Sequence, residues 1–161
     1  MATAARMPDL LISFSMFESG SHLGLIGIIT LLGAGMAFGL GNHHPLRWKA
    51  SASAVLHPLA CLGLFYSLAF YMHSRLGTWP KMIGLHGLPD DVLLHYDITA
   101  MTFAALIIGL LFVWPVAVLV CAVAPKMQAV LPYLGLYAVS AGVTFVAMEL
   151  APAPFLYWWW D

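Results

Sequence analysis

The chain has 161 residues, of which 62% are hydrophobic and only 8% are charged. Soluble domains are about 45–50% apolar and about 25% charged, so this composition excludes an ordinary soluble domain. The formal net charge is −1, from six basic and seven acidic residues. A nucleic-acid partner is therefore not expected, because binding phosphates requires a basic face. The composition predicts an integral membrane protein.

The first 20 residues contain one basic residue, Arg6, and an apolar run that serines interrupt. A secretory signal peptide has a basic start and an uninterrupted apolar centre, so we do not interpret this segment as a cleaved signal. We predict that residues 1–20 form a short amphipathic segment at the membrane interface.

Four stretches are long and apolar enough to cross the membrane as helices. Crossing about 30 Å of hydrocarbon takes about 20 residues of helix. We place the spans at about 22–41, 51–73, 96–123 and 130–150. They predict an all-α fold, in which residues 1–161 form a single transmembrane domain, an integral membrane four-helix bundle.

Prolines mark the boundaries and one interruption of these helices. Pro89 followed by Asp90 predicts a helix start ahead of the third span, and Pro132 suits the first turn of the fourth. Pro152 predicts the end of that fourth helix. Within the third span, Pro115 predicts a kink, because proline removes one helix hydrogen bond and clashes with the preceding turn.

Four spans place both termini on the same side of the membrane, which we name side A. Side A also holds the 74–96 loop, whereas side B holds the 42–50 and 124–129 loops. All seven acidic residues lie at or near side A, and the basic residues divide evenly between the sides. Because the basic residues of side B lie in short loops without acids, we expect side B to be cytoplasmic. The expected location is a multi-pass position in a membrane of the bacterial inner type.

Aromatic residues gather near side A, above all in the 151–161 tail with Tyr157 and its three following tryptophans. Amphipathic rings settle at headgroup depth, so we predict that this tail lies along the interface. Small residues mark the first span instead. Gly35 and Gly39 have the spacing that lets a second helix approach closely in lipid, either from this chain or from another copy.

The sequence places His57 inside the second span and Glu149 at the exit of the fourth, and we single these two out as intramembrane polar residues. Ionisable groups inside a membrane default to a functional interpretation. A neutral His57 bonded to a neighbouring helix is the structural alternative. Two stacked haems are excluded, because His57 and His73 are 16 residues apart and fall on nearly opposite helix faces.

Side A carries the candidate metal or haem ligands, which are His22, His73 and His95, with Asp91 and Glu149 as acidic neighbours. Imidazoles and carboxylates that meet at one rim bind zinc, copper or a similar divalent ion, and two imidazoles ligate a single haem. The spacings match no ligand motif, and acids at helix starts are also stabilised by the helix dipole. We therefore do not favour a cofactor.

The leading functional hypothesis is a non-enzymatic accessory or assembly subunit that packs against other membrane proteins or against itself. The first alternative is a metal- or haem-binding redox protein that uses the side A histidines. The second is a small transporter or proton relay through His57 and Glu149. The sequence shows no nucleophile elbow, phosphate loop or zinc-protease helix, so we lean against an enzyme.

Overall fold

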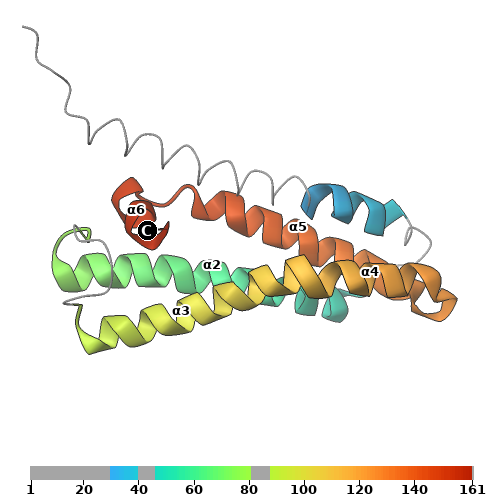
Figure 1. The fold of residues 1–161 in the computed structure, drawn as a ribbon, viewed down its shortest axis with the longest axis horizontal. Helices are drawn as coiled ribbons and strands as arrows, with labels where there is room; N and C mark the ends of the chain where they lie inside the picture. The colour runs from blue at the N-terminus through green and yellow to red at the C-terminus, as the bar shows by residue number, and fades with distance from the viewer. Residues whose placement is uncertain (1–29, 40–45, 81–87, 161) are drawn as a thin grey trace, which may run out of the picture.

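The structure is a computed structural model that describes residues 30–39, 46–80 and 88–160. The regular structure of the described residues is helical without β-strands, which confirms the all-α part of the predicted fold, whereas the four-span bundle stays a prediction. The expected segment 1–20 and half of the expected first span, residues 22–29 and 40–41, lie outside them. Figure 1 shows the arrangement of Thr30–Gly39, α2 (Trp48–Leu76), α3 (Asp90–Ile108), the π-helix η1 (Gly109–Val113), α4 (Trp114–Val123), the 3-10 helix η2 (Pro125–Val130), α5 (Leu131–Met148) and α6 (Ala153–Trp160).

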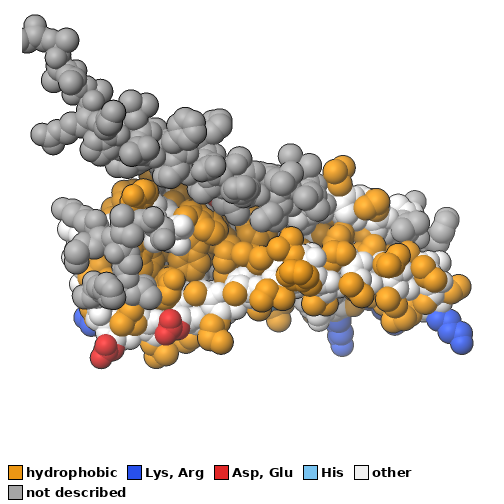
Figure 2. All heavy atoms as spheres, viewed as in Figure 1, with side chains coloured by type: hydrophobic (Ala, Val, Ile, Leu, Met, Phe, Trp, Pro, Cys, Tyr) orange, Lys and Arg blue, Asp and Glu red, His pale blue; other side chains and the backbone are white. Residues whose placement is uncertain are grey.

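Three helical stretches are long and apolar enough to cross a membrane. They are α2 with 29 residues, the continuous run Asp90–Val123 with 34, and Pro125–Met148 with 24. The described part of the first expected span is a shorter apolar helix, Thr30–Gly39. Hydrophobic side chains cover most of the visible surface of the described helices (Figure 2). This surface suits a lipid environment, in which apolar side chains carry no cost of exposure.

The third helix starts where the sequence predicts, and a π-helical turn precedes Pro115, for which the sequence predicts a kink. Pro89 is the N-cap, and the acids Asp90 and Asp91 occupy the first turn. Ahead of Pro115 the backbone forms the π-helix η1, in which the Trp114 N–H bonds to the Gly109 carbonyl. The proline ring would clash with the carbonyl four residues earlier, and the wider π turn gives it room. The helix therefore continues to Val123.

Helix α2 begins three residues earlier than predicted, so that Pro58 lies inside it and not in its first turns. The helix ends at Gly77, which has the left-handed conformation (φ 67°) that glycine adopts without strain. Deep in the bundle, the Thr144 hydroxyl of α5 donates a hydrogen bond to the Pro58 carbonyl over 3.0 Å. The proline inside α2 thus lies at a position where α5 forms a hydrogen bond to the α2 backbone.

Helix α2 packs most extensively on α5 and then on α3, whereas α4 packs on α5 (Figure 1). The end of α2 meets the start of α3 through Tyr71 and Asp91, which defines side A in the structure. At the other end, side B, the Arg47 N–H that precedes α2 bonds to Tyr133 near the start of α5. Half of the most apolar stretch of the α5 span is buried, against 28% for α2 and 22% for the α3–α4 run. Helix α5 is therefore the most enclosed span.

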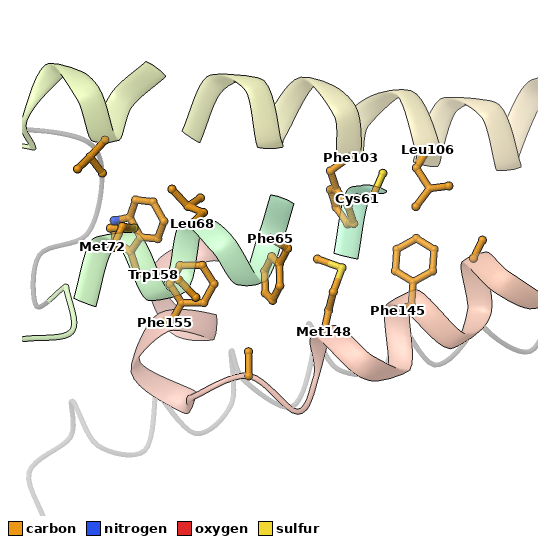
Figure 3. Close-up of a cluster of buried hydrophobic side chains, with 14 of the residues drawn as sticks. Cys61, Phe65, Leu68, Met72, Phe103, Leu106, Phe145, Met148, Phe155 and Trp158 are labelled. Atoms are coloured by element: carbon orange, nitrogen blue, oxygen red, sulfur yellow. The ribbon is translucent and has the colours of Figure 1, made fainter. Parts of the chain in front are cut away.

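The hydrophobic core lies toward side A, where α6 folds back onto the bundle. Phe155 is fully buried and packs edge-on against Phe65 of α2, and Trp158 of α6 is also buried (Figure 3). Tyr96 of α3 meets Trp158 edge-on. Because α5 ends at Met148 while α2 continues, α6 covers the part of α2 that α5 leaves open. The aromatic tail packs on the bundle, and its depth in a membrane stays a prediction.

The described glycines of the first helix face in different directions. A Cβ on Gly33 would lie 2.6 Å from Cζ3 of Trp114, so this glycine is what lets the indole ring reach the helix backbone. The ring is held in place, because its Nε1 donates to the Leu134 carbonyl over 2.8 Å. A Cβ on Gly35 or Gly39 would meet nothing within 4 Å. The pair proposed from the sequence therefore lies away from the neighbouring described helices.

This difference yields the first prediction. Gly33→Ala should lower the free energy of unfolding by about 1–3 kcal/mol, because the new methyl group overpacks against a ring that cannot turn away without losing its hydrogen bond. Gly35→Ala, two residues along the same helix, should change it little. Thermal unfolding of both variants in lipid nanodiscs measures the difference, and equal stability would mean that the Trp114 contact is absent in the membrane.

Candidate functional site

A cluster of polar side chains joins α2 to α3 at side A. The Tyr71 hydroxyl and the Arg75 guanidinium both donate to one carboxylate oxygen of Asp91, with Arg75 Nη2 at 2.8 Å. One turn deeper, Ser67 Oγ lies 2.9 Å from His95 Nε2. Each residue lies one turn from the next on its own helix, so that the two helices pair like a short antiparallel ladder.

The structure gives the predicted metal ligands of side A different neighbours. His95 contacts Ser67 and lies beside the Tyr71 ring. His73 stacks instead on Trp79, with ring centroids 4.4 Å apart. Within the described ranges, no group of three His, Cys, Asp or Glu side chains could hold a metal ion. His22 lies outside these ranges, so a metal or haem site that includes it stays a prediction.

The two predicted acidic neighbours of that site also differ. Asp91 forms a salt bridge with Arg75 and accepts a hydrogen bond from the Tyr71 hydroxyl. Glu149 is the exposed C-cap residue of α5. Its backbone N–H bonds to the Phe145 carbonyl, and among the described residues its side chain has no hydrogen-bond or ion-pair partner. The structure therefore brings His95 close to Asp91 through Tyr71, but it does not bring Glu149 to either of them.

His57, which the sequence places inside the second span, has a defined partner. His57 Nδ1 of α2 lies 3.2 Å from the hydroxyl of Tyr137 in α5, and the two rings lie nearly parallel at 6.2 Å. The same hydroxyl lies 3.4 Å from the position that a Cβ on Gly109 would take, in the first position of η1. Tyr137 thus reaches into a junction of α2, α5 and the π turn.

The polar contacts of α5 follow one face of that helix. Its hydroxyl residues Tyr133, Tyr137, Ser140 and Thr144 are spaced by four, three and four, which places them in one stripe. Three of them contact α2 or the residue before it. Tyr133 accepts from the Arg47 N–H, Tyr137 pairs with His57, and Thr144 donates to the Pro58 carbonyl. This stripe was not singled out from the sequence, although its spacing identifies the partner of His57.

Helix α2 contributes one further hydroxyl to the same interface. The Tyr66 hydroxyl donates to the Ala147 carbonyl of α5 over 2.7 Å. On the side facing α3, the Cys61 thiol lies 3.5 Å from the Thr102 carbonyl. These contacts join side-chain donors to backbone or side-chain acceptors of another helix, which is how polar residues hold helices together in lipid. Chemically, the arrangement can fix the helices and, at His57, bind a proton.

The buried and exposed contacts should differ in strength. Thr144→Val removes a buried hydrogen bond and should lower the free energy of unfolding by about 0.6 kcal/mol and at most about 1.7, independently of salt. Asp91→Asn weakens an ion pair whose side chains are 41% and 52% exposed, so its effect should be at most about 1 kcal/mol and should shrink in high salt. Unfolding measured in nanodiscs at low and high salt tests both, and a salt-dependent effect of Thr144→Val would contradict this assignment.

Comparisons with protein-family models, with curated proteins and with solved structures found no match to this chain.

Proposed function

We propose that this chain is a four-span membrane protein that acts as a non-enzymatic accessory or assembly subunit and packs against other membrane subunits or a second copy. The observation that carries this proposal is the face at Gly35 and Gly39, where an added Cβ would meet no atom of the described residues within 4 Å.

The opposite face of the same helix is closely packed. Ala34 and Ala37 are buried, and Gly33 lies against the Trp114 ring. The helix is therefore anchored to the bundle through one set of small residues and presents a second set outward. In lipid, small outward-facing residues let another helix backbone approach, and van der Waals contact over such a surface drives association. This arrangement favours a packing role over a face that touches lipid alone.

The polar groups of the spans support the same interpretation. The hydroxyls of Tyr66 and Thr144 bond to carbonyls across α2 and α5, and Tyr137 bonds to His57. Polar side chains committed to such contacts stabilise a fixed arrangement of helices. A substrate pathway would instead require them to face a shared polar cavity.

An association measurement tests the proposal. Gly35→Leu should leave the fold intact, because its side chain enters open space, and should reduce the amount of complex recovered in mild detergent by about tenfold or more if it disrupts about 1.4 kcal/mol of contact. Gly63→Leu is the matched control, since Gly63 of α2 is also open. Native mass measurement of both variants gives the result, and complexes of unchanged mass and yield with Gly35→Leu would refute the packing role of this face.

We further propose that the spans lie in a membrane of the bacterial inner type with side B toward the cytoplasm. The exposed Lys126 marks side B and the exposed Thr78 marks side A. The native cysteines are buried, so they should react slowly. In intact cells, an impermeant thiol reagent should label Thr78→Cys and not Lys126→Cys. Labelling of Lys126→Cys alone would reverse the orientation.

A further inference from the structure

We propose that His57 and Tyr137 form a proton-binding site inside the membrane-spanning part of the bundle, in which the neutral pair holds α2 to α5 with Tyr137 as the donor and proton uptake by His57 reverses the direction of that hydrogen bond. This inference is independent of the packing role of Gly35 and Gly39.

The position of His57 sets the environment of the site. It lies nine residues after Trp48, the first residue of α2, which corresponds to about 14 Å along the helix. The described acids, Asp90, Asp91, Asp97 and Glu149, all lie near the side A ends of α3 and α5. A charged imidazole at this position therefore has no described carboxylate to pair with. Protonation is costly there unless the contact with α5 changes.

The chemistry of the two rings fixes the direction of the hydrogen bond. A phenol is a stronger donor than a neutral imidazole N–H, and an unprotonated imidazole nitrogen is a stronger acceptor than a phenol oxygen. We infer that Tyr137 donates to Nδ1 of His57 over the 3.2 Å between them. His57 is then neutral and carries its proton on Nε2.

Proton uptake removes this acceptor. Imidazolium has N–H groups at both nitrogens, so Nδ1 no longer accepts and the Tyr137 hydroxyl must turn its proton elsewhere. The imidazolium Nδ1–H then donates to the Tyr137 oxygen, so that the pair stays in contact and holds a positive charge between α2 and α5. The Tyr137 oxygen lies beside Gly109 of the π turn, whose lack of a side chain leaves space for the hydroxyl to turn.

The titratable groups around the pair are few. From α5 they are Tyr137 itself and Tyr133, whose oxygen accepts from the Arg47 N–H. From α2, Cys61 lies one turn further along and contacts the Thr102 carbonyl of α3. The segments Thr30–Gly39 and η1 contain no titratable side chain. Within the described part of the chain, His57 is thus the imidazole at this junction.

Histidine labelled with ¹⁵N, in protein reconstituted into nanodiscs, tests the proposal. At about pH 8 the His57 signal, assigned by its disappearance in His57→Gln, should show an unprotonated Nδ1 and a protonated Nε2. Acidification to about pH 5 should protonate Nδ1 and lower the melting temperature. His57→Gln, which cannot take up a proton, should lose most of this pH-dependent shift. His73→Gln, which alters a histidine stacked on Trp79, should retain it.

A protonated Nδ1 at about pH 8, or a pH-dependent shift in His57→Gln as large as in the unmodified protein, would overturn the proposal. If His57→Gln does not fold, Tyr137→Phe provides the second test, because it keeps His57 and removes only the donor. Its Nδ1 signal should move as the hydrogen bond is lost. An unchanged Nδ1 signal in Tyr137→Phe would show that the two residues do not interact.

Discussion

The attachment of α2 to its neighbours through polar side chains is the interaction on which the rest of this structure depends. In lipid, apolar side chains gain little by leaving the hydrocarbon, so helix association relies on close packing and on hydrogen bonds between helices. Helix α2 uses both of its sides for this purpose. His57 and Tyr66 face α5, whereas Tyr71 and Arg75 reach Asp91 of α3. The remaining helices are arranged around these contacts.

Close packing of aromatic side chains adds to the polar contacts between the helices. The aromatic helix α6 covers the portion of α2 beyond the end of α5, with Phe155 buried against Phe65. Near the other end, the Trp114 ring fills the space above Gly33 and is held by the Leu134 carbonyl. The π turn before Pro115 shares in this arrangement, because it places Gly109 opposite the Tyr137 hydroxyl. The π turn before Pro115 is thus part of the junction between α2, α5 and η1.

The sequence was sufficient to predict the helices and insufficient to predict which of their faces meet. Apolar length predicted the long helices, and Pro89 and Pro132 predicted two of their starts, because these features act locally. The glycine spacing could not show that Gly33 faces inward and Gly35 outward, since helix rotation depends on the distant Trp114. For the same reason the sequence grouped His73 with His95, although Trp79 and Ser67 hold them separately. The spacing of the hydroxyl residues on α5 predicts one polar face on that helix, but only the structure shows that Tyr137 on this face meets His57.

The central claim is that hydrogen bonds between helices, and not hydroxyl groups as such, hold α2 in place. Its most direct test compares the melting temperatures of two triple variants in nanodiscs. One removes hydroxyls that bond between α2 and α5, by Tyr66→Phe, Tyr137→Phe and Thr144→Val. The other removes hydroxyls that bond within their own helices, by Ser53→Ala, Thr102→Val and Ser140→Ala. The account predicts a much lower melting temperature for the first variant only, and an equal loss in both would contradict it.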